Sequence, residues 1–246
     1  AYVTSVVLSD STDPTGDNDS PTADQMSVIE NLWIMNANER DIRSLAGIRY
    51  FTELRALNCF RNQLTELDIS KNTKLVGLSC DGNQLTSLDV SALPNLQSLS
   101  CSSNQLTELD VSALPDLERL NVSMNKITAL DVSNNTKLVD LFCGNNKIPE
   151  LDVSGLLDLE SLDCWVNQLT ALDVSKNTKL NSLNCDGNQL TSLDVSNNTK
   201  LTSLSCWKNQ ISGLDISGMS NLENLYVSMN QLTSLDVSKN TKLTWL

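Results

Sequence analysis

The chain has 246 residues, and its 17 Lys and Arg stand against 30 Asp and Glu, which gives a formal net charge of −13. Phosphate binding draws on clustered Lys and Arg, and no such cluster occurs, so this composition excludes nucleic acid as the expected partner. No apolar run approaches the roughly 18–20 residues that are needed to cross a bilayer, so we also expect no membrane insertion.

Residues 1–31 precede the periodic part of the chain and contain neither Lys nor Arg. We predict an acidic segment that ends in a short N-terminal helical cap. Residues 22–25, T-A-D-Q, have the spacing of a capping box. The residues that follow supply an apolar helical face: Met26, Ile29 and either Leu32 or Trp33. Such a helix would cover the open end of the first coil.

The acidic segment also has the features of a degraded calcium loop, since calcium needs oxygen ligands at alternating positions. The candidate ligands are Asp13, Asp17, Asp19 and Asp24. The glycine of the sharp turn is missing, the spacing is about one residue too long, and Gln25 stands where a bidentate Glu belongs. We therefore favour a solvated acidic loop without a cofactor and keep calcium as the alternative.

From residue 32 to residue 246 the chain follows a 21-residue repeat that reads L-x-x-L-x-C-x-x-N-x-L-x-x-L-D-V-S-x-x-x-x. Residues 32–53 form an irregular first repeat, residues 54–242 form regular repeats, and residues 243–246 begin a truncated one. The ninth position is asparagine at every step: Asn62, Asn83, Asn104, Asn125, Asn146, Asn167, Asn188, Asn209 and Asn230. A period of about 20–50 residues predicts a solenoid of stacked coils in place of a single globular core.

The sixth position carries seven cysteines and two valines: Cys59, Cys80, Cys101, Val122, Cys143, Cys164, Cys185, Cys206 and Val227. In stacked parallel strands this column would form a row with a spacing of about 4.8 Å. A row provides neither the converging Cβ atoms of a disulfide nor the tetrahedral cluster that zinc needs. Because valine also occupies the column, we predict a buried, reduced ladder of structural cysteines.

The fifteenth position is aspartate in nine successive repeats: Asp68, Asp89, Asp110, Asp131, Asp152, Asp173, Asp194, Asp215 and Asp236. Stacked carboxylates repel one another, so we predict that each accepts hydrogen bonds from turn amides or from Ser and Thr. We also expect compensation from nearby lysines: Lys74, Lys137, Lys179, Lys200 and Lys242. A calcium-binding roll is the alternative interpretation, although the glycine-rich turns of such rolls are missing.

Position 19, in the turn after L-D-V-S, is either the asparagine of an Asn-Thr-Lys turn or an apolar residue. The apolar residues are Leu93, Leu114, Leu156 and Met219. Asparagine satisfies the backbone of the turn, whereas the apolar side chains fill the same space. We predict that the two solutions are interchangeable.

The recurrence of L-x-x-L-x-C-x-x-N followed by L-D-V-S resembles the leucine-rich repeats of bacterial surface proteins, and most closely the cysteine-bearing 21-residue type of the internalin group. The resemblance covers about residues 32–246. It implies an α/β repeat solenoid that is mostly β, namely a right-handed leucine-rich-repeat superhelix with a parallel concave sheet. It also implies that the ninth-position asparagine turns inward to bond the backbone of the bend. An extracellular or cell-surface location follows from the same resemblance.

Positions 3, 5, 7 and 8 of each repeat point out of the predicted concave face, and most carry small residues. Six aromatic residues project from this face: Phe60, Phe142, Trp165, Trp207, Tyr226 and Trp245. A ring left in water forgoes roughly 1.5–3 kcal/mol of burial, so such a patch is typical of a contact surface, unless the rings merely cover one another. Phe142 and Trp165 lie two residues apart on adjacent coils, and we expect Trp207 and Tyr226 to repeat that offset. The predicted ligand-binding residues are Phe142, Trp165, Trp207, Tyr226, Asp140, Asp163, Asp186 and Lys208.

Catalysis has no support in the sequence, because histidine is absent, no Ser or Cys lies beside a base, and no glycine-rich phosphate loop occurs. We therefore predict a non-enzymatic recognition module of a secreted or cell-surface bacterial protein, with a protein partner on the concave face. Glycan binding through Trp165 and Trp207 is the second hypothesis, and a passive spacer is the third.

The sequence stops at Leu246, four residues into a new repeat. An uncapped sheet edge pairs readily with another molecule. We therefore expect either further sequence in the native protein or a monomer with weak end-to-end association through this edge.

Overall fold

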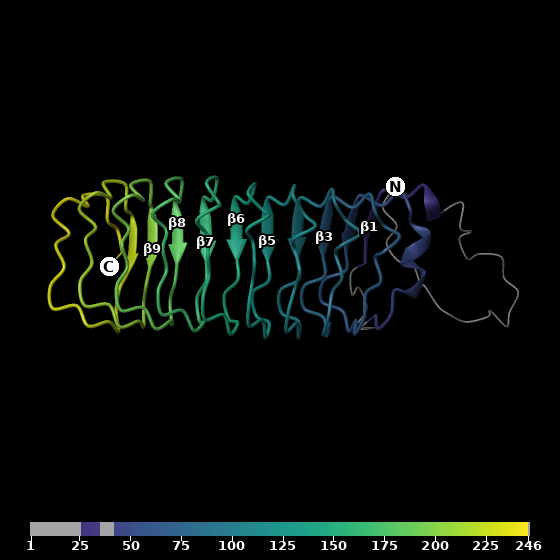
Figure 1. Ribbon diagram of the computed structural model, residues 1–246, viewed down its shortest axis with the longest axis horizontal. Coiled ribbons are helices and arrows are strands. Elements are labelled where there is room, and N and C mark those ends of the chain that lie inside the picture. Colours follow the sequence, from purple (N-terminus) through teal and green to yellow (C-terminus); the bar gives the residue numbers. More distant parts are fainter. Residues whose placement is uncertain (1–25, 35–41, 246) are drawn as a thin grey trace, which may run out of the picture.

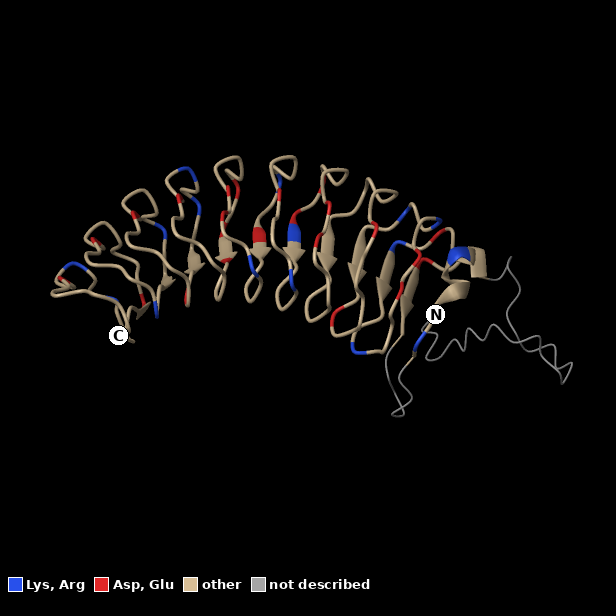
Figure 2. Cartoon of the chain, turned by 60° about the horizontal axis from the view of Figure 1, so that its bottom comes forward, with Lys and Arg blue, Asp and Glu red and all other residues tan. Residues whose placement is uncertain are grey.

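The structure is a computed structural model that describes residues 26–34 and 42–245. In these residues, ten short strands form one parallel sheet in which the order of the strands is their order in the chain (Figure 1). Their bounds are β1 (Asn31–Trp33), β2 (Ala56–Asn58), β3 (Gly77–Ser79), β4 (Ser98–Ser100), β5 (Arg119–Asn121), β6 (Asp140–Phe142), β7 (Ser161–Asp163), β8 (Ser182–Asn184), β9 (Ser203–Ser205) and β10 (Asn224–Tyr226). The fold is a β-solenoid with one coil per repeat, and the coils follow an arc (Figure 2).

Each strand is centred on a leucine that points into its coil. Leu57 of β2 pairs with Leu78 of β3, and both side chains are buried. The residues that flank the leucine in these strands are half-buried and point outward. The repeat therefore fixes the register, because a shift by one residue would turn every central leucine to solvent.

The N-terminal part differs from the regular coils by a short 3-10 helix, η1 (Ala46–Tyr50), which the sequence analysis did not predict. Leu45, Ile48 and Phe51 are buried and recur every three residues, which is the spacing at which side chains align in a 3-10 helix. No helix in the described part of the chain has the length and apolar character that a membrane crossing requires. The predicted capping box (residues 22–25) and the candidate calcium ligands Asp13, Asp17, Asp19 and Asp24 lie outside the described residues.

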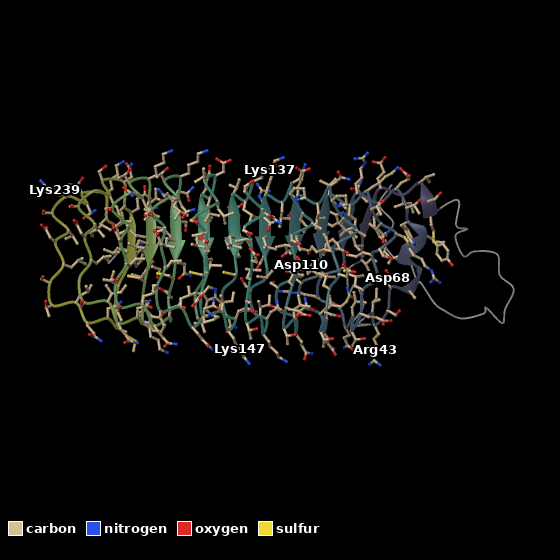
Figure 3. All side chains as sticks on the ribbon, in the orientation of Figure 1. Arg43, Asp68, Asp110, Lys137, Lys147 and Lys239 are labelled. Atoms are coloured by element: carbon tan, nitrogen blue, oxygen red, sulfur yellow. The ribbon has the colours of Figure 1, made fainter. Side chains whose placement is uncertain are left out.

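The seven cysteines form the predicted ladder. All are buried and free, and their sulfur atoms follow a row along the stack (Figure 3). Burial raises the pKa of the thiols, to about 12 for Cys59 and Cys143. Protonated thiols behave as small apolar groups, and Val122 is buried to the same degree in the same column. The position therefore accommodates a medium-sized apolar side chain, and valine serves there as well as cysteine.

The ninth-position asparagines, which we call the bend asparagines, tie each coil to the one before it. Asn146 donates from Nδ2 to the carbonyl oxygens of Val122 and Cys143, both at 3.0 Å. Its Oδ1 accepts the amide of Ile127 at 3.0 Å. The same bonds recur at the other bend asparagines. This confirms that the asparagine turns inward and satisfies the backbone of the bend.

The asparagines at position 19, which we call the turn asparagines, are Asn72, Asn135, Asn177, Asn198 and Asn240. Asn135 donates from Nδ2 to the carbonyl oxygens of Val111 at 2.9 Å and Leu114 at 2.8 Å. Its buried Oδ1 has no hydrogen-bond partner in the part of the chain that the structure describes, and the same holds for the other four. Leu93, Leu114, Leu156 and Met219 are buried at the same position in the remaining coils. Both kinds of side chain therefore fill the same site, as the sequence predicts.

The aspartate column lies at the start of the turn, and each carboxylate accepts the amide of the serine two residues on. Asp110 Oδ1 accepts the amide of Ser112 at 2.9 Å, and the hydrogen bonds from this serine hold the pKa of the Asp110 carboxyl below its usual value. For three of the five lysines predicted to compensate this column, the prediction was wrong, because they pair with other carboxylates. Lys137 pairs at 2.6 Å with Asp116 of the preceding coil, and it projects away from Asp110 in Figure 3. Lys137 lies at the end of the turn, at the last position of the repeat, whereas the aspartate precedes the turn. Two further lysines pair in the same way: Lys74 with Glu53, and Lys179 with Asp158.

Candidate ligand-binding site

The surface that we call the sheet face consists of the side chains at positions 3, 5, 7 and 8, which point away from the buried leucines. The eighth position has a positive φ in every regular repeat, so the chain turns sharply after position 7. Two of these residues are glycine, and the β-branched one is Val166, with a φ of 47°. Because the backbone adopts this left-handed conformation at position 8, the chain bends away from the sheet directly after position 7.

A shallow hollow of about 450 Å³ lies on the sheet face over β7–β10. Small polar residues form its floor: Ser182, Asn184, Ser203 and Ser205. Trp207 and Tyr226 line it on the side of β9 and β10, and Asp163 and Asp186 line it on the side of β7 and β8. The parallel register explains this grouping, because the fifth position forms one row across the four strands, from Asp163 to Tyr226.

The two rings of the hollow remain accessible. Trp207 is 38% exposed and Tyr226 is 47% exposed. The ammonium group of Lys208 lies 5.7 Å from the centroid of the Trp207 ring, which is within cation–π range. The hollow therefore offers aromatic surface to a ligand, and one of its rings already attracts a cation.

The two carboxylates of the hollow are partly buried. Asp186 Oδ1 accepts the hydroxyl of Ser205 at 2.6 Å and the amide of Trp207 at 2.7 Å. Burial raises the pKa of the Asp186 carboxyl. Burial also raises the pKa of Asp163, and the neighbouring charge of Asp186 acts in the same direction. None of the ion pairs in the described part of the chain involves either carboxylate.

The other predicted residues lie outside the hollow. Asp140 pairs with Arg119 at 3.1 Å, so its charge is already compensated. Trp165 lies flat on Gly144, where an added Cβ would come within 2.1 Å of ring atoms. Phe142 is half-buried in β6. The structure therefore brings four of the eight predicted residues together and places Lys208 against Trp207 at their edge.

The two aromatic pairs are offset in opposite senses, which corrects the expectation that one repeats the other. Trp165 follows Asp163, the strand partner of Phe142, so the second ring lies farther along the strand direction. Trp207 follows Ser205, the strand partner of Tyr226, so here the first ring lies farther along. The two rings of the first pair are 23 residues apart in the sequence and those of the second pair are 19 apart, and this difference could have predicted the opposite offsets.

Trp33 is a sheet-face residue that the sequence analysis missed. It lies in β1, pairs with Asn58 of β2, and is 54% exposed, so it does not belong to a helical face. The irregular first repeat hid it, because the regular spacing begins only at Leu54. Aligning Leu32 with Leu57 would have placed Trp33 at the fifth position.

The hollow combines hydroxyl, amide, carboxylate and aromatic groups. These groups suit binding by hydrogen bonds, stacking and charge.

In residues 26–34 and 42–245 there is no cluster of three or more His, Cys, Asp or Glu that could hold a metal ion.

Comparison with known proteins gives consistent matches to leucine-rich repeats. A family model described as leucine-rich repeats (two copies) matches residues 73–116, 94–135 and 199–244. The functional domain of InlJ from Listeria monocytogenes, which includes a cysteine ladder, matches with a TM-score of 0.88 at 44% identity, over 90% of this chain and 49% of that chain. The internalin InlF from Listeria monocytogenes matches with a TM-score of 0.83 at 29% identity, over 91% of this chain and 68% of that chain.

A leucine-rich-repeat protein of Leptospira interrogans matches with a TM-score of 0.70 at 25% identity, over 89% of this chain and 66% of that chain. The present chain thus spans about half the length of the InlJ domain and about two thirds of the other two. No curated protein matches the sequence.

Proposed function

This chain is a leucine-rich-repeat protein of the internalin-like, cysteine-bearing type, and from that premise we propose that it is a non-enzymatic recognition module of a secreted or cell-surface bacterial protein. Its partner is a protein, which it binds on the concave face formed by the sheet. Leucine-rich-repeat folds of this type are typical of protein–protein recognition.

The observation that carries this proposal is the exposure of Trp207 and Tyr226 beside a polar floor. Folding alone gives no reason to leave large rings partly in water, and a partner that covers their exposed area regains a part of the roughly 1.5–3 kcal/mol that full burial of such a side chain gives. Aromatic anchors that are surrounded by small polar residues are the usual hot spots of protein interfaces. The hollow therefore has the composition of the centre of a binding surface.

The test is affinity capture with the intact chain, followed by identification of the captured protein and measurement of its Kd. We expect Trp207→Ala to weaken that binding by about 2 kcal/mol or more. The matched control is Tyr50→Ala. Tyr50 is 44% exposed and also has a cation over its ring, that of Arg49 at 5.3 Å, but it lies on η1. Equal loss of binding in both variants, or no loss in either, would contradict the proposal.

Glycan binding is the second candidate, because the two rings flank a floor of hydroxyl and amide groups next to two carboxylates. Sugars bind by stacking on such rings and by hydrogen bonds to such polar groups. Saturable quenching of tryptophan fluorescence by oligosaccharides, without capture of a protein, would favour this candidate. A passive spacer would show neither response.

A further inference from the structure

Two aspartates occupy the seventh position of the repeat, and their carboxylates differ in one hydrogen bond. Asp81 Oδ1 accepts the hydroxyl of Ser100 and the amide of Ser102, and Asp81 Oδ2 accepts the hydroxyl of Ser79 at 2.9 Å. Asp186 makes the first two bonds with Ser205 and Trp207. Asn184 stands in the place of Ser79, and among the described residues no hydroxyl group donates to Asp186 Oδ2. One oxygen of a partly buried carboxylate is therefore left for a ligand.

Charge compensation is also incomplete at this place. Asp163 and Asp186 both line the hollow, and no Lys or Arg in the described residues forms an ion pair with either. Elsewhere on the sheet face, Arg119 neutralises Asp140 at 3.1 Å. Two carboxylates that lose part of their hydration without gaining a cation favour a positively charged guest.

The aromatic side of the hollow suits the same guest. The Lys208 ammonium is 5.7 Å from the centroid of the Trp207 ring, which shows that this ring accommodates a cation. Tyr226, on the next strand, presents a second exposed ring. An arginine side chain combines a flat surface that stacks on rings with a fork of donors that fits carboxylates, whereas lysine offers only a point charge.

We propose that the hollow over β7–β10 is a subsite for an arginine side chain of the partner protein. This inference rests on the proposed function. The guanidinium group stacks against Trp207 or Tyr226 and donates to Asp186 Oδ2 and to Asp163. The hydroxyl groups of Ser182 and Ser203 accept its remaining donors. The subsite thus selects partners that present an exposed arginine.

The proposal can be tested with a small probe, N-acetylarginine amide, added to the intact chain. Binding is followed by the NMR shift of the Trp207 indole N–H, assigned with Trp207→Phe. We expect a Kd on the order of 1 mM, as for other ligands of this size. N-acetylcitrulline amide, which has the same shape without the charge, should bind at least about 10-fold more weakly. N-acetyllysine amide should also bind more weakly than the arginine probe.

The decisive variant is Asp186→Asn, with Asp81→Asn as its matched control. Asparagine keeps an oxygen for the hydroxyl and amide donors that Asp186 Oδ1 serves, so the fold persists, but it replaces Oδ2 by a donor. We expect Asp186→Asn to weaken binding of the arginine probe at least about 10-fold. Asp81→Asn should leave the affinity within about 2-fold. A further variant, Lys208→Gln, removes the competing cation and should strengthen binding.

Equal binding of arginine and citrulline probes, or equal binding by the wild type and Asp186→Asn, would overturn the arginine subsite. The same holds if lysine binds as tightly as arginine, or if methyl glycosides shift the Trp207 signal while the arginine probe does not. The recognition function can fail separately. A captured partner whose affinity falls with Trp207→Ala but not with Asp186→Asn would leave protein recognition intact and remove the arginine subsite alone.

Discussion

The bend of every regular coil and the turn of five of them contain an inward-pointing asparagine, yet the two places depend on it differently. In the bend, Asn146 uses Nδ2 and Oδ1 and satisfies backbone groups of two coils. In the turn, Asn135 uses only Nδ2 and leaves its Oδ1 without a partner. The bend holds asparagine in all nine regular repeats, whereas the turn alternates between asparagine and an apolar residue. A buried amide is required only where each of its atoms has a partner.

The largest expected effect is at the bend. Asn146→Leu removes the acceptor of the buried Ile127 amide and a donor to the Val122 and Cys143 carbonyl oxygens. Because unpartnered buried polar groups cost about 1–3 kcal/mol each, we expect the free energy of unfolding to fall by about 3 kcal/mol or more. Urea denaturation measures it. A loss below about 1 kcal/mol would show that the bend does not need its asparagine.

The backbone of the bend provides the second prediction. Val166 has a φ of 47°, a conformation that β-branched residues adopt at a cost, while Asn145 takes the same position in the preceding coil with a φ of 53°. We expect Val166→Asn to raise the free energy of unfolding by about 0.5–1 kcal/mol, because asparagine tolerates this region. Asn145→Val is the reverse control and should lower stability by a similar amount. If both variants shift the urea midpoint in the same direction, strain at this position is not the cause.

The turn should tolerate the change that the bend does not. Asn135→Leu loses two hydrogen bonds but also removes a buried, unpartnered Oδ1, and Leu114 and Leu156 fill the equivalent place in the adjacent coils. These terms oppose one another, so we expect a change of no more than about 1 kcal/mol. Both variants should be measured in the same urea titrations. If Asn135→Leu lowers the free energy of unfolding as much as Asn146→Leu does, the distinction between the bend and the turn does not hold.

The smallest effect concerns the aspartates at the start of the turn. Hydrogen bonds from Ser112 lower the pKa of Asp110 in the folded state below its ordinary value of 3.8, and the other members of the column behave alike. The stability that these carboxylates contribute is therefore fully present when the pH is above their ordinary pKa. It is lost as the pH falls through their lower pKa in the folded state. We therefore expect the urea concentration at the unfolding midpoint to decrease once the pH is lower than about 4.

The matched variant is Asp110→Asn, which keeps an acceptor for the serine amide but does not titrate. Its urea midpoint should depend on pH more weakly than that of the wild type. An identical pH dependence would show that the column does not contribute to acid sensitivity.

Much of the candidate site could be predicted from the sequence, because the position of a residue in the repeat predicts whether its side chain points out of the core. Trp207, Tyr226, Asp163 and Asp186 were assigned to the sheet face from their positions and lie together in one hollow. Trp33 escaped because its repeat is irregular. The role of Trp165 was also beyond the pattern, since its ring lies on Gly144 of the neighbouring coil.

The inward turn of the bend asparagines was implied by the family resemblance. The sequence by itself determined the 21-residue coil and the buried leucine and cysteine columns. It did so because spatial neighbours in a solenoid are residues one period apart, so a column in the sequence is a column in space. Only the tertiary structure decided how outward side chains use their neighbours: Arg119 neutralises Asp140, Lys137 turns to Asp116, and Asp186 retains an oxygen without a partner. Those outcomes depend on the direction and reach of individual side chains across adjacent coils, which the period leaves undefined.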